Sequence, residues 1–169
     1  MMDLVECWPT YLSICAEQEE FSKSPIPAFY AYRTSSYDKF NTTIPYSGTS
    51  LNTNNVLNTA TGVFTAPAKG LYYFYFSATK QVGKSSLTIE LRKNNEVISI
   101  KHIHSQTNGT EGSANHVLPI DVQATLSLNV NDTVYAVLGG DVPTNAIVDS
   151  MDPCFTKLTS FTGFLIQPM

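Results

Sequence analysis

The sequence has few charged residues and no long apolar run, and both absences limit what the protein can do. Charged side chains make up 14% of the 169 residues, with 10 Lys and Arg against 14 Asp and Glu. Because Lys and Arg form no run, the chain lacks the electrostatic patch that non-specific binding to nucleic acid requires. No stretch reaches the roughly 18 uninterrupted apolar residues of a membrane-spanning helix. We therefore expect neither nucleic-acid binding nor membrane insertion.

The sequence also lacks the short motifs of common enzymes. It contains no Gly-x-Ser-x-Gly, no His-Glu-x-x-His and no Cys-x-x-Cys. These are signatures of serine hydrolases, zinc proteases and redox or metal sites. It has no Gly-X-Y tract and therefore no collagen triple helix. We expect a protein that is not an enzyme and that requires no cofactor.

Uncharged polar residues supply most of the polarity, with 12 Asn, 16 Ser and 19 Thr. Such residues are typical of turns, and from Pro25 onward they separate short apolar stretches, which is the pattern of an all-β sandwich or barrel. We predict about nine or ten strands. The clearest are residues 28–33, 71–79, 86–92, 96–105, 125–130, 133–138 and 161–166. Turns are predicted at Gly48, at residues 93–95 and at residues 131–132.

Residues 1–24 are predicted to be an N-terminal appendage, and residues 25–169 a single domain. The appendage has Asp3 and Glu6 where a signal peptide carries Lys or Arg, and Pro9 interrupts its apolar part. We therefore do not expect the appendage to be a retained signal peptide.

One predicted strand, Gly-Leu-Tyr-Tyr-Phe-Tyr-Phe, is aromatic on both faces. Because side chains alternate along a strand, Tyr72, Phe74 and Phe76 can fill a sandwich core while Tyr73 and Tyr75 point the other way. The outward tyrosines are either partly solvated through their hydroxyl groups or covered by other copies of the chain.

The last predicted strand is two-sided in the same way. Phe161 and Leu165 lie on one face, and Phe164 and Ile166 lie on the other. A monomeric sandwich would leave one of these pairs exposed. Burial against identical chains is therefore the better interpretation.

The spacing of eight residues resembles the signature of the complement C1q globular-head domain. That pattern has an aromatic residue, Asn or Asp six residues later, an aromatic or Leu five further on, Phe after seven more, and then a Gly-x-aromatic-x-Phe-x-aromatic strand. The matching positions are Tyr46, Asn52, Leu57, Phe64, Gly70, Tyr72, Phe74 and Phe76. The one departure is Tyr46, where the pattern usually has Phe. Further similarity covers roughly residues 25–168, including the opening segment 25–33 and the closing segment 160–168.

The resemblance implies an all-β, ten-stranded jelly-roll sandwich of the C1q/tumour necrosis factor type that assembles as a homotrimer. It implies that the outward side chains of two strands face the neighbouring subunits, namely Tyr73, Tyr75, Phe164 and Ile166. Members of this family are secreted recognition or signalling proteins without known catalysis. We therefore expect a secreted, lectin-like protein of innate immunity that binds microbial or host surface glycans or polyanions. The alternatives are a cerebellin-like connector or cytokine-like ligand for a protein receptor, and a component of the extracellular matrix.

Two polar segments are candidates for calcium binding, because hard cations need clustered oxygen ligands. The candidate ligands are Gln106, Asn108, Glu111, Asp149 and Asp152. Several family members resemble this protein in having such loops near the trimer apex, although the loops match no fixed family spacing. The alternative is that both segments are solvated polar loops.

Two histidines alternate on a predicted strand and therefore share one face. His102 and His104 could bind a metal ion if a further ligand approached, and His116 is a possible third. The alternative is a pair of partly exposed histidines on an outer sheet.

Three sequons would permit N-glycosylation of a secreted eukaryotic protein, at Asn41, Asn108 and Asn131. Sequons also occur by chance in a chain rich in Asn and Thr. At Asn131 the tolerance of Asn for left-handed backbone in a tight turn is a sufficient explanation.

The three cysteines leave an odd number for any pairing. Cys7 and Cys15 could pair with each other or link chains, and cerebellin-like relatives resemble this arrangement in placing interchain cysteines before the domain. Cys154 could be a free thiol of the core.

Overall fold

The computed structural model describes residues 25–81, 86–104, 118–139, 146–148, 150–152 and 155–169, and of residues 150–152, 155 and 156 the backbone alone. Strands dominate these ranges, and the one helical element within them is the single 3-10 turn η1 (Thr53–Asn55). No helix in the described part is long and apolar enough to cross a membrane. The all-β fold expected from the sequence is confirmed.

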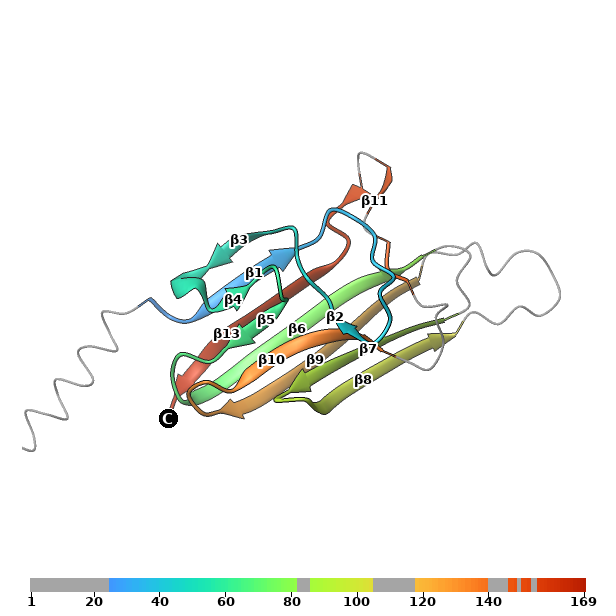
Figure 1. The fold of residues 1–169 in the computed structure, drawn as a ribbon. Helices are drawn as coiled ribbons and strands as arrows, with labels where there is room; N and C mark the ends of the chain where they lie inside the picture. The colour runs from blue at the N-terminus through green and yellow to red at the C-terminus, as the bar shows by residue number, and fades with distance from the viewer. Residues whose placement is uncertain (1–24, 82–85, 105–117, 140–145, 149, 153–154) are drawn as a thin grey trace, which may run out of the picture.

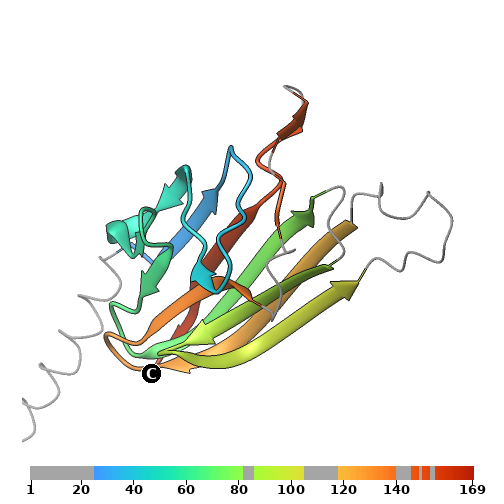
Figure 2. The same ribbon diagram turned by 45° about the vertical axis from the view of Figure 1, so that its right-hand side comes forward.

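Two antiparallel sheets are layered face to face, as Figure 1 shows. Sheet A has the strand order β3-β1-β13-β6-β9, with β1 (Ala28–Tyr32), β3 (Gly48–Asn52), β6 (Gly70–Lys80), β9 (Leu118–Leu128) and β13 (Ser160–Pro168). Sheet B has the order β4-β5-β10-β7-β8, with β4 (Leu57–Asn58), β5 (Val63–Thr65), β7 (Ser86–Lys93), β8 (Glu96–His104) and β10 (Thr133–Gly139). The short β2 (Thr42–Thr43) also pairs with β10. A hairpin of β11 (Ser150–Asp152) and β12 (Phe155–Thr156) stands apart from both sheets (Figure 2).

The register places the ends of several strands together. Lys80 pairs with Leu118 and Ser86 with His104, so the end of β6, the start of β7, the end of β8 and the start of β9 lie at one end of the sandwich. The C-terminal strand finishes at the other end, where Pro168 pairs with Gly70, and Figure 1 marks the C-terminus there.

Six of the seven strands named from the sequence are observed within two residues of their predicted bounds, and β9 is the exception. It begins at Leu118, seven residues before the predicted start at 125. The early part carries Pro119 and places the polar residues Asp121 and Gln123 on its outward face, so it lacks the apolar run that the prediction relied on. Such a strand is stable at a sheet edge, where a proline is tolerated, and β9 is an edge strand.

Two details of the strands differ from the prediction. The described residues form 13 strands, compared with the nine or ten predicted, because two-residue strands such as β2 and β4 and the β11–β12 hairpin carry too little sequence pattern to be recognised. Gly48 is the first residue of β3 rather than a turn residue, and it pairs with Tyr32. A Cβ atom at Gly48 would lie 2.9 Å from the Tyr32 hydroxyl oxygen, so the glycine allows the tyrosine to lie across this strand.

A cluster of phenylalanine rings fills the space between the sheets. Phe29 lies 5.5 Å from Phe64 and 4.9 Å from Phe161, measured between ring centroids, and Phe64 lies 5.1 Å from Phe74. All four rings are buried, and each contributes about 1.5–3 kcal/mol through removal from water. Gly163 makes room for this cluster, because a Cβ atom there would lie 2.6 Å from the Phe74 ring.

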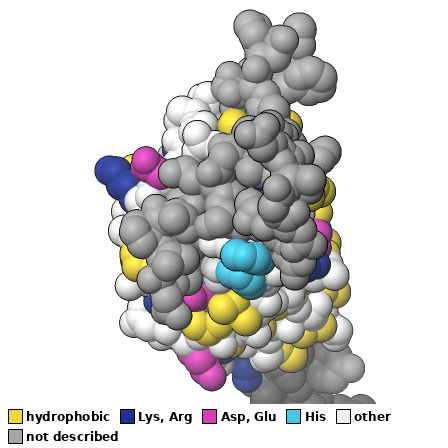
Figure 3. Space-filling model, turned by 90° about the vertical axis from the view of Figure 1, so that its right-hand side faces the viewer, with side chains coloured by type: hydrophobic (Ala, Val, Ile, Leu, Met, Phe, Trp, Pro, Cys, Tyr) yellow, Lys and Arg dark blue, Asp and Glu magenta, His cyan; other side chains and the backbone are white. Residues whose placement is uncertain are grey.

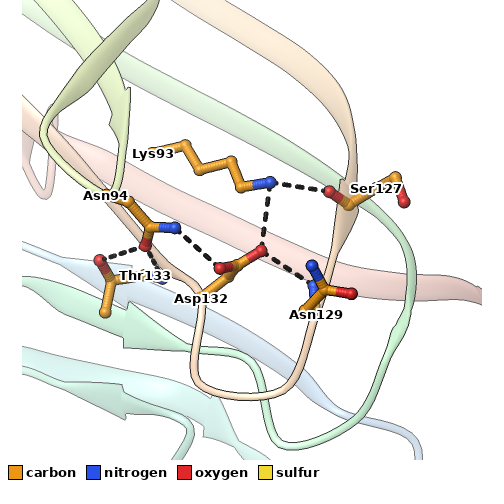
Figure 4. A network of polar contacts seen from close by, with 6 residues as sticks. All are labelled: Lys93, Asn94, Ser127, Asn129, Asp132 and Thr133. Atoms are coloured by element: carbon orange, nitrogen blue, oxygen red, sulfur yellow. Dashed lines mark hydrogen bonds and ion pairs between the residues drawn. The ribbon is translucent and has the colours of Figure 1, made fainter.

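Asp132 joins two turns by hydrogen bonds, as Figure 4 shows. Its carboxylate accepts hydrogen bonds from the Asn94 side-chain amide at 2.7 Å and from the Asn129 backbone amide at 2.9 Å. The Lys93 ammonium lies 3.1 Å from the same carboxylate. The Asn94 hydrogen bond, with that from Asn129 and the contact with Lys93, holds the pKa of Asp132 below its ordinary value.

Asn94 and Lys93 extend this network across the sandwich. The Asn94 side-chain oxygen accepts hydrogen bonds from the Thr133 backbone amide at 2.8 Å and from its hydroxyl at 3.1 Å. Lys93 donates to the Ser127 carbonyl oxygen at 3.0 Å. The β7–β8 turn of sheet B is thereby tied to the β9–β10 turn, through which the chain passes from sheet A to sheet B. Both turns were predicted from the sequence, and both are confirmed.

We expect Asp132→Asn to lower the free energy of unfolding by about 1–2 kcal/mol at pH 7, because charge-assisted hydrogen bonds are lost. The pKa of Asp132 is lower in the folded chain than in the unfolded chain. Its contribution is therefore present above the unfolded pKa, about 4, and is lost as the pH falls through the folded pKa. The variant should consequently lose less stability than the wild type between pH 5 and pH 2, which denaturant titrations across that range would measure.

Asp38→Asn is the matched control, because Asp38 is exposed. It should leave both the stability and its pH dependence close to those of the wild type. An Asp132→Asn variant with the wild-type pH dependence would contradict a stabilising role for the carboxylate.

Candidate functional site

The outward face of sheet A is the candidate site, and it arises from strict alternation along β6 and β13. Along β6, every residue from Gly70 to Lys80 alternates between a buried and a half-buried position. Tyr72, Phe74 and Phe76 are fully buried, whereas Tyr73 and Tyr75 point outward and are half-buried. The prediction of a strand with two aromatic faces is confirmed.

β13 continues the same outward face. Phe161 and Leu165 are buried, whereas Phe164 is 42% exposed and Ile166 is 50% exposed. Phe164 pairs in register with Tyr73, and their ring centroids are 5.6 Å apart. The two aromatic side chains therefore cover each other only in part.

One hydrogen bond fixes the orientation of the outward Tyr73. Its hydroxyl donates to the side-chain oxygen of Gln123 on β9 at 2.7 Å. The hydroxyl is thereby satisfied within the sheet, and the ring is held across the neighbouring strand. Such a ring offers apolar surface to a partner without requiring a new hydrogen bond.

The face extends over β1 and β3 to residues that the sequence analysis missed. Tyr30 pairs with Thr162 on one side and with Leu51 on the other. Tyr30 and Leu51 are both exposed. Tyr30 could have been recognised from the sequence, because it alternates with the buried Phe29 and Ala31. We define the sheet A aromatic face as Tyr30, Leu51, Tyr73, Tyr75, Phe164 and Ile166.

Charged side chains are nearly absent from sheet A. The five strands contain two, Lys80 and Asp121. Lys80 is fully buried, and this burial lowers the pKa of its ammonium group. Asp121 lies on the outward side of the edge strand β9. The centre of the sheet A aromatic face is therefore uncharged, which favours burial against another apolar surface.

A second charge lies near the opposite margin of the face. The Lys157 ammonium lies 4.1 Å from the centroid of the Tyr32 ring, in a cation–π contact. Tyr32, Ser160, Ser77 and Asp121 form one row across the sheet in register. The row continues from Tyr32 to Gly48 on the edge strand β3, so Asp121 lies at one end of the row and Lys157 contacts the row near its other end.

The residues of the spacing motif occupy structural positions. Seven of the eight are buried. They are Gly70 and six aromatic or apolar side chains, namely Tyr46, Leu57, Phe64, Tyr72, Phe74 and Phe76. Asn52 has a different task, because its side chain donates to the Leu57 carbonyl oxygen at 2.9 Å and accepts from the Leu57 amide at 3.1 Å. This pair of hydrogen bonds closes the segment between β3 and β4 and explains the five-residue spacing of Asn52 and Leu57.

Gly70 is required by a close approach of two strands. A Cβ atom there would lie 2.5 Å from Leu165 Cδ1 and 2.7 Å from the Gln167 carbonyl oxygen. The glycine therefore lets β13 lie directly against the start of β6, where the register brings the two strands together.

The side chains that the structure describes include none of the calcium candidates. Gln106, Asn108, Glu111 and Asp149 lie outside them, and of Asp152 the backbone alone is described, in β11. Within the described part, no group of three or more His, Cys, Asp or Glu residues is placed to hold a metal ion. Calcium binding stays a prediction.

Two of the three sequons can be located. Asn41 and Asn131 are both exposed and have left-handed backbone, with φ of 51° and 70°. The tight turn at Asn131 is confirmed, and glycosylation at either residue stays a prediction. Asn108 and the three cysteines, Cys7, Cys15 and Cys154, lie outside the described residues.

Comparisons with known proteins agree with the spacing motif. A family model described as the C1q domain matches residues 28–166. Complement C1q tumor necrosis factor-related protein 3 of human and that of mouse are each 24% identical over 139 residues, covering 82% of this chain and 50% of the relative. The chain thus spans about half the length of the curated relatives it matches.

Solved structures share the fold. The globular domain of zebrafish complement 1qA protein has a TM-score of 0.61 and 21% identity, covering 85% of this chain and 99% of that domain. The Eiger tumour necrosis factor of S. frugiperda has a TM-score of 0.63 and 13% identity, covering 86% of this chain and 95% of that one. The jelly-roll architecture expected from the sequence is therefore confirmed.

Proposed function

The chain belongs to the C1q domain family, and from that premise we propose that it is a secreted, non-catalytic binding protein that assembles as a homotrimer. The observation that carries the proposal is the sheet A aromatic face. Six apolar or aromatic side chains project from one sheet whose centre is uncharged. Exposed apolar surface of this kind marks a contact with another protein surface. A second copy of the same chain offers the matching chemistry.

A closed ring suits this face better than a symmetric pair. In a ring, each subunit presents one margin of its sheet to the opposite margin of the next subunit. Asp121 lies at one end of a row of sheet A, and Lys157 contacts Tyr32 of the same row from the segment before β13, near the opposite margin. A ring of three brings the negative margin of one subunit against the positive margin of its neighbour.

The leading ligand class is a surface glycan or polyanion, as the family resemblance implies. Three copies of one subunit would bind a repeating ligand multivalently, so a weak single site would give strong overall binding. The strand ends at Lys80, His104 and Leu118 lie together at one end of the sandwich. In a trimer, the three copies of that end would face the same side.

A protein receptor is the second candidate, and one observation favours it. Val97 and Ile100 are exposed on β8, the edge strand of sheet B, away from the sheet A aromatic face. Apolar side chains on the outside of an assembled trimer would suit a protein partner better than a polar glycan. This candidate corresponds to a cytokine-like or connector role.

We expect the wild-type protein to have a mass of about three times 18.6 kDa in light scattering coupled to size exclusion. Phe164→Asp should reduce that mass to that of the monomer, because burying an unpaired carboxylate in the subunit contact is strongly unfavourable. Phe164 is 42% exposed, so the subunit itself should remain folded. Val97→Asp is the matched control, since Val97 is 44% exposed but lies on sheet B. A monomeric wild type, or equal effects of both variants, would contradict the proposed contact.

The two margins can be tested by exchanging their charges. Lys157→Asp should weaken the trimer, since two negative margins then meet, and Asp121→Lys combined with Lys157→Asp should restore part of the lost affinity. Analytical ultracentrifugation over a range of concentrations measures the effect. A double variant no better than its single components would show that these margins do not meet.

Ligand class is tested by binding the trimer to an array of microbial and host glycans, with calcium and with a chelator. We expect selective binding, weakened for Phe164→Asp because avidity is lost. Loss of binding in the chelator would support a calcium site. An array without signal would count against the glycan ligand and favour the protein receptor.

A further inference from the structure

Two histidines lie side by side on the sheet opposite to the sheet A aromatic face. His102 and His104 alternate on β8 and are both exposed, with ring centroids 6.3 Å apart and ring planes within 16° of parallel. Figure 3 shows them as one continuous patch that is open to solvent. Metal ions commonly bind to pairs of imidazole rings presented in this way.

Thr88 on the neighbouring strand β7 holds one of the two rings. Its Oγ1 lies 2.7 Å from His102 Nδ1, and the two residues are paired in register. When the hydroxyl oxygen accepts this bond, Nδ1 carries the proton and Nε2 keeps its lone pair. Histidine ligands of metals are typically oriented by such a hydrogen bond at the other ring nitrogen. Thr88 is only 4% exposed, so its hydroxyl is fixed by the sheet.

We propose that His102 and His104 form a binding site for a divalent transition metal ion, with zinc as its probe. His102 contributes Nε2, His104 contributes the second imidazole nitrogen, and water completes the coordination shell. Thr88 is the positioning residue. The site lies on sheet B and does not depend on the proposed trimer or its ligand.

The two rings must approach and turn to bind one ion. A tetrahedral zinc ion with nitrogen ligands at 2.0–2.1 Å holds the two ring centroids about 5 Å apart. The observed separation of 6.3 Å and the nearly parallel ring planes therefore require an approach of about 1 Å and a rotation that points both nitrogen lone pairs at the ion. Because both side chains are exposed, rotation about their side-chain bonds can supply both movements without moving the backbone.

The charged side chains described nearby, Glu90 and Lys101, are not placed to bind an ion or to repel one at the two histidines. Glu90 lies on the same face of β7, but Arg92 engages its carboxylate, with Nε at 2.8 Å and Nη2 at 2.5 Å. Lys101 pairs with the inward-facing Ile89, so alternation places it on the other face of β8. Among the described residues no third His, Cys, Asp or Glu joins the pair, so the site is expected to bind zinc more weakly than a three-ligand centre.

Isothermal titration of the full chain with zinc chloride tests the proposal. We expect the wild type to bind one more zinc ion per chain than His102→Asn or His104→Asn, or to bind it at least about tenfold more tightly. Thr88→Val should also weaken binding about tenfold, because it removes the orienting hydrogen bond but keeps both imidazole rings. Circular dichroism establishes that each variant remains folded.

His116→Asn separates the proposed two-histidine site from one that also uses His116, which the sequence left as a possible third ligand. It should bind zinc as the wild type does. Equal zinc binding by the wild type and both β8 variants, or loss of binding in His116→Asn, would overturn the two-histidine site. Unchanged binding by Thr88→Val would overturn the positioning role. Trimer mass is measured in parallel and should be the same for all four variants, so failure here is distinguishable from failure of the proposed assembly.

Discussion

The two-residue repeat of the β-strand is the constraint on which this structure depends. β6 carries aromatic residues in consecutive positions, so it cannot bury all of them in one core. The inward set packs among the phenylalanine rings between the sheets, and the outward set must lie on the surface of sheet A. The buried side chains that stabilise the subunit and the outward side chains that are proposed to contact another subunit thus come from the same seven-residue segment, 70–76.

This division holds only while each strand keeps its register, since a slip of one residue would exchange the two faces. Local devices prevent such a slip. Asp132 and Asn94 tie the turns at one end, Asn52 closes the segment before β4, and Gly70 and Gly163 admit close packing that a larger residue would block. These polar and steric contacts stabilise the fold directly, and they also determine which side chains the surface presents.

Sequence patterns predicted the parts of the fold in which apolar residues alternate clearly or match the motif. β6, β13 and the buried motif residues belong to this group. The early half of β9 was missed because an edge strand can be polar outside and contain Pro119. The contribution of Leu51 was missed because it depends on which strand pairs with β1. The contact between Thr88 and His102 could not be predicted either, since it requires the cross-strand register of β7 and β8. Sequence thus identifies which residues alternate, whereas the fold determines which of them meet.

The position of the C-terminus has a practical consequence for how the molecule is handled. The exposed Met169 follows the pairing of Pro168 with Gly70, at the end of the sandwich away from Lys80 and Leu118. A tether attached there, such as a biotin tag on a sensor surface, leaves the opposite end of the subunit directed into solution. Immobilisation through the C-terminus therefore orients every molecule in the same sense.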